Sequence, residues 1–453
     1  MNAPTPDPAR GEEVVALDRK HVFHSWSAQG ALNPLAIASA EGSYFWDYEG
    51  TRYLDFSSQL VNTNIGHQHP KVVAAIQEQA GKLSTVAPQH ANDARSEAAR
   101  MISELAPPNH RKVFFTNGGA DAIENAVRMA RLHTGRHKVL SAYRSYHGNT
   151  TTAVTLTGDP RRWPNENGVA GIVHFFGPYP YRSAFWAEGD EQEAERALEH
   201  LESVIQFEGP QTIAALTLES VVGTAGVLIP PAHYLAGVRE LCTKYGIIYI
   251  ADEVMAGFGR TGDWFAFNHF GVEPDLITFA KGVNSGYVPV GGVIISDEIA
   301  ATFDDRVFPG GLTYSGHPLA AASIVGTINA MRDEGVVENA KAIGENVLGP
   351  GLRELAERHP VIGEVRGLGV FWALDLVKNR DTREMLVPYN ASGAANAPMV
   401  ELVGACKSRG LMPFTNYNRL HVVPPCTVSE TEAKEGLAIL DEAFGAIAHH
   451  YTA

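Results

Sequence analysis

Short apolar runs alternate with amphipathic stretches through the middle of this 453-residue chain. The runs 246–252 and 275–280 are apolar apart from one aspartate each, so both faces of such strands have to be buried. Strands of this kind, separated by helices, are typical of a mostly parallel sheet covered on both faces. The expected strands are 112–116, 137–143, 213–220, 246–252, 275–280 and 291–296, and the expected helices between them are 121–133 and 233–245. Ligands of these sheets bind where the strands end.

The pattern changes after residue 335. A helix at 337–358, two strands within 361–377, a helix at 397–409, a strand at 419–425 and a helix at 428–448 predict a smaller α+β domain. Aromatic alternation at 42–56 predicts a hairpin, which we expect to pack against that domain. The chain is thus divided into an N-terminal segment (1–69), a large domain (70–335) and a C-terminal small domain (336–453).

Composition excludes several classes of protein. A net charge of −15 without a Lys/Arg-rich run disfavours a nucleic-acid partner. Cys242, Cys406 and Cys426 are far apart, which predicts neither a disulfide framework nor a metal site and fits a cytoplasmic protein. The first residues lack the basic and apolar parts of a signal peptide. The sequence contains no uninterrupted stretch of about 18 apolar residues, so no membrane span is predicted.

Two features near strand ends could serve a planar, phosphorylated ligand. Gly118, Gly119 and Ala120 lie between an expected strand and a helix, where backbone N–H groups and the helix N-terminus suit a phosphate. The simpler interpretation is a tight turn. Tyr146 and His147 follow the next strand, where an aromatic side chain could stack on a ring; both could equally be buried loop residues.

Two ionisable residues end the most apolar strands. Burial of the Asp252 carboxylate at a strand end costs free energy unless it has a partner, and a pyridinium N–H is a suitable partner. The alternative interpretation is that Asp252 caps a helix or forms a salt bridge. Lys281 follows the next strand, where desolvation would lower its pKa and make the amine nucleophilic. A surface lysine is the alternative reading of Lys281. The four features together supply the parts that pyridoxal 5′-phosphate (PLP) requires, each at a strand end.

Over about residues 30–450 the chain resembles the class III (ω-amine:pyruvate type) aminotransferases, which are PLP enzymes of fold type I. The resemblance is carried by DEVMAGFGRTG, with Lys281 29 positions after Asp252, and is supported by TYSGHP (313–318) and VVPP (422–425). It implies a large domain with a mostly parallel seven-stranded sheet flanked by helices. A smaller α+β domain would be formed by the N- and C-terminal segments.

The resemblance also implies roles for single residues. Lys281 would form the internal aldimine and move the proton, and Asp252 would pair with the pyridine nitrogen. The other cofactor contacts would be Gly118, Gly119, Ala120, Tyr146, His147, Glu219 and Val254, with Thr313 reaching the phosphate of a neighbouring subunit. A shared site of this kind implies a homodimer, with a tetramer as the larger alternative.

The expected substrate site departs from the family pattern. Phe414 stands where the amine:pyruvate branch commonly has a mobile arginine. Arg419, five residues later, is either its substitute or an ordinary strand residue, and Arg144 and Arg162 are further candidates for a substrate carboxylate. Apolar residues are expected at the mouth of the site: Phe23, Trp26, Leu60 and Val61.

These features predict a ping-pong transamination from a primary amine or ω-amino acid to a keto acid, for which we expect pyruvate. Other class III chemistry is the alternative: an aminomutase, a racemase, a decarboxylase, or an aminotransferase for taurine or β-amino acids. A non-catalytic interaction protein on this fold is disfavoured by Lys281 and Asp252 together.

Overall fold

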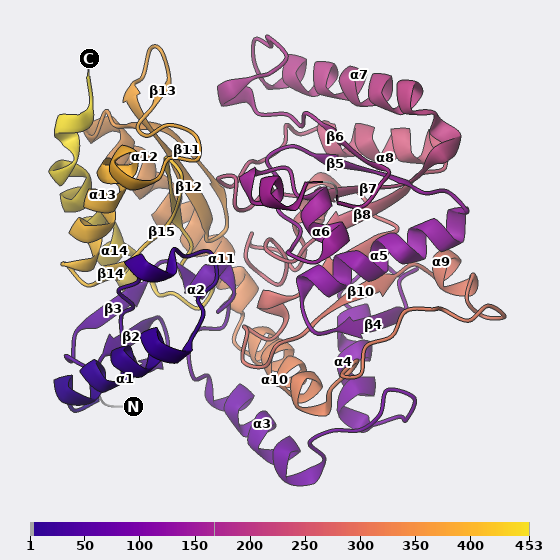
Figure 1. Cartoon of the computed structure of the whole chain (residues 1–453), viewed down its shortest axis with the longest axis horizontal. Helices are drawn as coiled ribbons and strands as arrows, with labels where there is room; N and C mark the ends of the chain where they lie inside the picture. Colours follow the sequence, from indigo (N-terminus) through magenta and orange to yellow (C-terminus); the bar gives the residue numbers. More distant parts are fainter. Residues whose placement is uncertain (1–3, 167, 453) are drawn as a thin grey trace.

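A computed structural model describes residues 4–166 and 168–452. Its centre is a seven-stranded sheet, on the right of Figure 1. In spatial order the strands are β4 (Lys112–Thr116), β10 (Gly291–Ile295), β9 (Leu276–Phe279), β8 (Ile248–Asp252), β7 (Ile213–Glu219), β5 (Lys138–Ala142) and β6 (Ile172–Phe175). Only β10 runs antiparallel to its neighbours; the remaining pairs are parallel. The predicted α/β fold with a mostly parallel seven-stranded sheet is confirmed.

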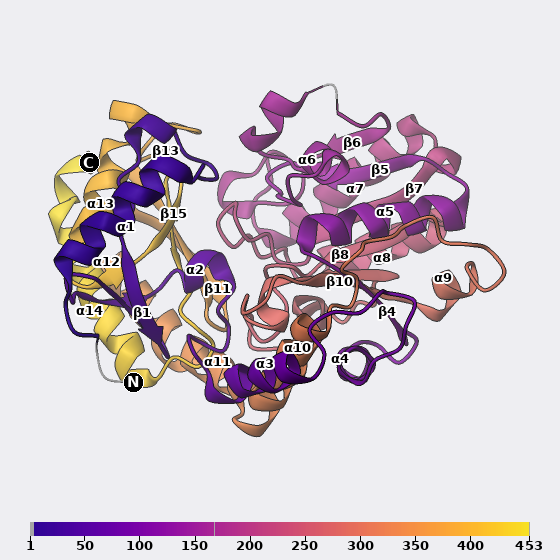
Figure 2. The ribbon, with the colours of Figure 1, turned by 60° about the horizontal axis from the view of Figure 1, so that its bottom comes forward.

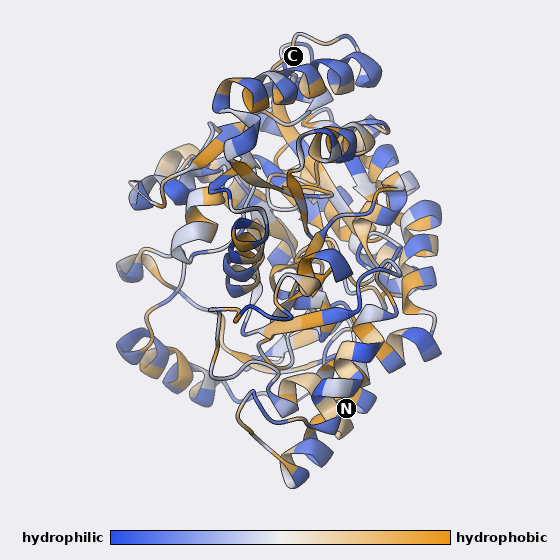
Figure 3. Cartoon of the chain, turned by 90° about the vertical axis from the view of Figure 1, so that its right-hand side faces the viewer, coloured by the Kyte–Doolittle hydropathy of each residue, from blue (hydrophilic) through white to orange (hydrophobic). Residues whose placement is uncertain are grey.

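The strands are apolar throughout because each side of the sheet is covered. Along β8, Ile248 and Ile250 pack with α5 (Gly119–Thr134), whereas Tyr249 and Ala251 belong to a core on the opposite face. That second core contains residues of α4 (Asp93–Ser103), α7 (Asp190–Glu208), α8 (Tyr234–Tyr245) and α10 (Pro318–Asp333). Period-two alternation therefore places successive side chains in two different apolar layers. Figure 3 shows the hydrophobic sheet enclosed by helices with hydrophilic outer faces.

Two smaller sheets bring the ends of the chain together. One contains β1 (Ile37–Glu41), β2 (Tyr44–Asp47), β3 (Arg52–Asp55) and β14 (Leu411–Met412); the other contains β11 (Ile362–Leu368), β12 (Phe371–Asn379), β16 (Arg419–Val422) and β15 (Phe414–Asn416), with β13 (Glu384–Met385) beside β12. Strand β14 pairs in parallel with β3, so the early hairpin and the C-terminal segment share a sheet. Figure 2 shows the indigo N-terminal elements lying against the yellow C-terminal helices. The domain limits at 69/70 and 335/336 stay a prediction.

The remaining helices complete both regions. They are α1 (Pro8–His21), α2 (Ser58–Val61), α3 (Pro70–Lys82), α6 (Thr151–Leu156), α9 (Asp297–Ala301), α11 (Val336–Ile343), α12 (Gly349–Arg358), α13 (Ala397–Lys407) and α14 (Glu430–Ala446). No helix in the described part of the chain is long and apolar enough to cross a membrane.

The helix expected at 337–358 is interrupted. A π-helical turn at Gly344–Leu348 separates α11 from α12, and the Gly349 N–H donates to the Gly344 carbonyl five residues earlier. Pro350 has no N–H, so it cannot continue the regular hydrogen-bond ladder. Gly344 also lies against the backbone of Gly369, where any side chain would clash. The helical spacing of apolar residues continues across this turn, so the sequence pattern predicts one uninterrupted helix.

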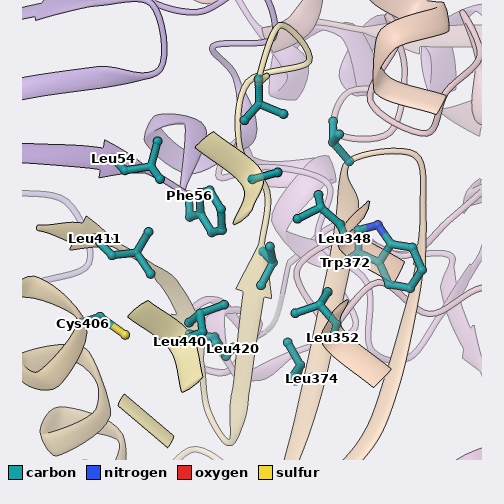
Figure 4. Packing of buried hydrophobic residues seen from close by; sticks show 14 of the residues in the cluster. Leu54, Phe56, Leu348, Leu352, Trp372, Leu374, Cys406, Leu411, Leu420 and Leu440 are labelled. Carbon is teal, nitrogen blue, oxygen red and sulfur yellow. The ribbon is translucent and has the colours of Figure 1, made fainter. Parts of the chain in front are cut away.

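Phe56 anchors the early segment in the C-terminal core (Figure 4). Its ring is 1% exposed and packs so closely on α14 that a Cβ at Gly436 would lie 2.0 Å from Cζ of Phe56. Phe56→Ala should therefore lower the free energy of unfolding by about 3–5 kcal/mol, since it removes a buried ring and leaves a cavity.

Denaturant unfolding followed by fluorescence measures this change for Phe56→Ala. The matched control is Phe207→Ala, because Phe207 is 92% exposed. Equal midpoints for both variants would show that Phe56 does not hold the N-terminal segment in place.

Candidate active site

The carboxyl ends of β5, β7, β8 and β9 meet at one side of the large sheet, next to the N-terminus of α5. A cavity of about 600 Å³ opens there. Among its lining residues are ten that the sequence predicted: Trp26, Gly118, Gly119, Ala120, Tyr146, His147, Glu219, Asp252, Val254 and Lys281. Strand topology thus joins side chains from positions 26 to 281 around one space.

Lys281 lies directly beyond β9, in a conformation that L-residues rarely adopt. Its φ is +46°, in the left-handed region. Burial lowers the pKa of the ammonium to about 8, although the charges of Asp252 and Glu219 act in the opposite direction. A backbone strained in this way persists where the surrounding structure enforces it, and it is a common property of functional positions.

Asp252 ends β8 and is buried beside His147. Nδ1 of His147 lies 2.7 Å from Oδ2 of Asp252, and the Thr278 hydroxyl donates to Oδ1 at 3.3 Å. Burial alone would lower the pKa of His147, but the hydrogen bond and charge of Asp252 outweigh it and raise that pKa above the ordinary value. The pair therefore keeps a carboxylate at the cavity without leaving it unpaired.

Glu219, at the end of β7, fixes the shape of the cavity wall. Its carboxylate accepts the N–H of Tyr146 at 3.0 Å and the N–H of Gly223 at 2.8 Å. Burial, with the nearby charge of Asp252, raises its pKa to about 6, while His147 acts to lower it. Glu219 therefore joins the β5 loop that carries Tyr146 to the turn that follows β7.

The turn before α5 is open toward the cavity. No heavy atom lies within 4 Å of the position that a Cβ on Gly118 would occupy. A Cβ on Gly119 would instead lie 2.9 Å from Cγ1 of Val254, so only glycine fits there. Exposed N–H groups at the N-terminus of a 16-residue helix suit a phosphate dianion.

The guanidinium of Arg161 stacks on the ring of Tyr146. The guanidinium carbon of Arg161 lies 3.6 Å from the ring centroid, and Arg161 is held there by a bidentate ion pair with Asp159. Its positive charge also acts on Lys281, where it helps to lower the pKa. The sequence interpretation had missed Arg161 and had chosen its neighbour Arg162.

Arg162 does not lie at the cavity. Its guanidinium donates to His174 at 2.9 Å and pairs with Glu166 at 3.0 Å, and its predicted role in substrate binding stays a prediction.

The predicted apolar mouth is only partly assembled. Trp26 and Ser25 line the cavity. Leu60 is half exposed on α2, where Ser58–Val61 all have φ between +44° and +69°. Val61 is instead buried in a core with Phe371, and Phe23 is 86% exposed and lies off the cavity lining. The predicted roles of these two residues as substrate contacts stay a prediction.

Four other predicted residues lie outside the cavity lining. Thr313 is exposed, and Phe414 packs on His421 with ring centroids 4.7 Å apart. Arg144 and Arg419 lie beyond the turn that follows β7. The cavity includes polar residues that the sequence interpretation did not select: Asn62, Asn117, Asn149, Thr224 and Asn284. Asn149 directly follows Tyr-His-Gly and could have been found from that proximity.

Comparison with known proteins identifies the family. Residues 26–444 match the family model for class III aminotransferases. The chain belongs to the class III aminotransferases. It is 38% identical over 395 residues to the putrescine–pyruvate aminotransferase of Pseudomonas aeruginosa, which covers 83% of this chain and 85% of that one.

Solved structures agree with this assignment. A taurine:2-oxoglutarate aminotransferase from Bifidobacterium kashiwanohense, in complex with PLP and glutamate, is 43% identical with a TM-score of 0.93; the match covers 97% of this chain and 98% of that one. An (S)-enantioselective ω-transaminase from Thermomicrobium roseum is 36% identical with a TM-score of 0.91, over 98% and 99% of the two chains. This enzyme is therefore a PLP-dependent aminotransferase of fold type I.

The residues at the cavity fit PLP. A buried amine, a buried carboxylate beside the ring position and an unobstructed turn at a helix N-terminus match its aldehyde, pyridine nitrogen and phosphate. A buried amine and a helix N-terminus that is open toward a cavity are both completed by such a ligand. We therefore assign Lys281, Asp252 and the 118–120 turn as the residues that would hold the cofactor.

The lowered pKa of Lys281 has a measurable consequence. Only the free amine attacks an aldehyde, so the rate of covalent PLP uptake by cofactor-free enzyme should rise up to about pH 8 and then level off. An ordinary lysine would still gain rate up to about pH 10.4. Stopped-flow absorbance between pH 6.5 and 10.5 measures this profile.

Lys281→Ala is the control, which should bind PLP without a borohydride-reducible link. A wild-type rate that continues to climb above pH 9.5 would contradict a desolvated Lys281.

Proposed function

We propose that this aminotransferase moves the amino group of a short ω-amino acid with an acidic end to a keto acid, in two alternating half-reactions at Lys281. The observation that carries the donor class is Arg161, which stacks on the ring of Tyr146, a residue of the cavity lining. The named relatives support it, since taurine is in the names of the Bifidobacterium enzyme and of a 32% identical enzyme from Bilophila wadsworthia.

The bound cofactor supplies an electron sink that makes the carbon–hydrogen bond next to the substrate nitrogen acidic. Lys281 Nζ is the base that takes this proton and returns it to the neighbouring position. Asp252, held in place by its hydrogen bond with His147, would pair with the ring nitrogen of the cofactor. Val254 and Tyr146 line the same cavity and would contact the faces of the ring, and Glu219 keeps the Tyr146 backbone in place.

Arg161 is suited to the acidic end of the donor. Asp159 occupies Nε and Nη2 of Arg161, which leaves Nη1 without a hydrogen-bond partner among the described residues. Trp26 adds an apolar surface at the same cavity. A guanidinium that is already oriented loses little entropy when it binds a carboxylate or sulfonate.

Arg161→Gln should therefore lower kcat/KM for taurine and β-alanine by about 10- to 100-fold, because one charge-assisted hydrogen bond is lost. The values for 1-phenylethylamine, which has no acidic end, should change less than about threefold. Conversion of the PLP form by each donor, followed by absorbance, gives these constants without an acceptor.

Arg162→Gln is the matched control and should leave both donors unchanged. Equal losses for taurine and 1-phenylethylamine in Arg161→Gln would remove Arg161 from donor recognition. If the wild-type enzyme removes the amino group from none of these donors in the presence of a keto acid, the proposed transamination is wrong as a whole.

We also propose a homodimer in which Thr313 binds the phosphate in the neighbouring subunit. Thr313 is exposed in this chain, as a residue that serves a partner would be. Light scattering should give about twice the chain mass of 48.9 kDa, and Thr313→Val should weaken PLP binding by about 10-fold. A monomer that binds PLP normally would contradict both expectations, and Thr431→Val, at another exposed threonine, serves as the surface control.

A further inference from the structure

Two histidines and a glutamate converge near the C-terminal end of the chain. His449 and His450 belong to the short helical turn η9 (Ala448–His450), and Glu401 belongs to α13. Nε2 of His450 lies 2.8 Å from Oε2 of Glu401, and Nε2 of His449 lies 3.8 Å from the same oxygen. In the described part of the chain, no other three His, Cys, Asp or Glu side chains bring their ligand atoms within 4.8 Å of one another.

The backbone selects the tautomer of His449. Its Nδ1 lies 3.2 Å from the carbonyl oxygen of Ala446. Because a carbonyl oxygen only accepts hydrogen bonds, Nδ1 of the neutral ring carries the proton and Nε2 presents a lone pair on the side of Glu401. The hydrogen bond between His450 and Glu401 uses one proton, and none is left for His449. A cation between the three side chains would bind both imidazoles and the carboxylate at once.

The distances between these atoms suit a metal ion. In a tetrahedral zinc site with bonds of about 2.1 Å, neighbouring ligand atoms lie about 3.4 Å apart. The two nitrogen–oxygen distances, 2.8 and 3.8 Å, lie on either side of that value. The side chain of His449 is 62% exposed and that of His450 is 26% exposed. An ion can therefore enter from solvent, and water can complete its coordination.

The turn that carries the two histidines is held on both sides. Ile447, directly before η9, is fully buried in a core that also contains residues of α13 and α14. After the turn, the Thr452 N–H donates to the Lys378 carbonyl on β12 at 2.7 Å. Figures 1 and 2 both show the end of the chain close to α13. Ligands on a fixed backbone lose little conformational freedom when they bind an ion.

The donor set selects the class of ion. Imidazole nitrogens suit zinc, copper and nickel, whereas calcium and magnesium prefer ligands that are all oxygen. The absence of a metal site was predicted from the three separated cysteines, and this cluster contains none of them. Glu401 lies 49 residues before His450, so only the fold brings the ligands together. None of the three residues lines the cavity at Lys281, so an ion held here is separate from the reaction.

We propose that Glu401, His449 and His450 bind one divalent transition-metal ion of the zinc type, which fastens η9 to α13. The ion takes the place of the proton between His450 and Glu401, and the ring of His450 then carries its proton on Nδ1. The negative carboxylate offsets part of the charge of the ion. The bound ion thus adds a link between α13 and the end of the chain, independent of the apolar contacts beneath it.

The first test measures zinc binding to the PLP-loaded full chain after treatment with a chelator and dialysis. Calorimetric titration with zinc chloride should show one high-affinity site per chain. Glu401→Gln, His449→Ala and His450→Ala should each weaken that site by at least about 10-fold, since each removes one donor of three. Magnesium chloride should give no such site, because magnesium prefers oxygen ligands.

The matched control is His24→Ala, which should leave zinc affinity unchanged. His24 also pairs with a carboxylate, at 2.6 Å from Asp18, and its side chain is 27% exposed, close to the value for His450. No third ligand joins that pair among the residues that the structure describes. Because the proposed ligands are at the surface, the PLP absorbance of each variant should equal that of wild type.

Two further measurements locate the ion. The electron paramagnetic resonance spectrum with one equivalent of copper(II) should show coupling to two nitrogens in wild type, but to one nitrogen in His449→Ala or His450→Ala. Hydrogen exchange in the peptide 446–452 should slow by at least about threefold when zinc is added to wild type, and should not change in His450→Ala.

The outcomes that would overturn the site are distinct. Zinc affinity that survives all three substitutions, an equal loss in His24→Ala, or the same nitrogen coupling in wild type and His450→Ala would place the ion elsewhere. Tight zinc binding without slower exchange at 446–452 would overturn the link between η9 and α13.

Discussion

The buried ion pair between Asp252 and His147 is the constraint on which the site depends. Both side chains are almost fully excluded from water, and their Oδ2–Nδ1 distance of 2.7 Å is what makes that burial tolerable. Glu219 and Lys281 are also buried at the same sheet edge, so two acidic and two basic groups share one weakly screened space. A large parallel sheet is required to hold all four in place, because they come from different strand ends.

The sequence predicts the large sheet well because doubly covered strands are apolar throughout. Each predicted strand from 112–116 to 291–296 is present within about two residues. The functional residues at the ends of these strands can also be predicted from the sequence. Asp252 and Lys281 end apolar runs, where a charged side chain is costly without a partner. Local composition and global topology agree here, which is why ten predicted residues meet at one cavity.

Loops are less predictable, because their geometry follows from tertiary contacts rather than from periodicity. Arg161 and Arg162 are adjacent and chemically identical, and only the bidentate contact with Asp159 turns the former toward Tyr146. The left-handed turn at Ser58–Val61 is likewise invisible in a run of ordinary L-residues. It is held by the fully buried Arg260, which contacts the Ser58 hydroxyl and Asn64. That conformation buries Val61 while Leu60 remains half exposed.

Positive charge has been redistributed around the cavity relative to the family pattern. Phe414 occupies the position of the mobile arginine and packs on His421, whose burial lowers its pKa to about 3 and leaves the imidazole neutral. Two arginines lie outside the cavity lining, Arg161 against the ring of Tyr146 and Arg419 two residues before His421 on β16. Fixed charges at separate places can distinguish acidic substrates by the position of the charge, without a side chain that swings between two states.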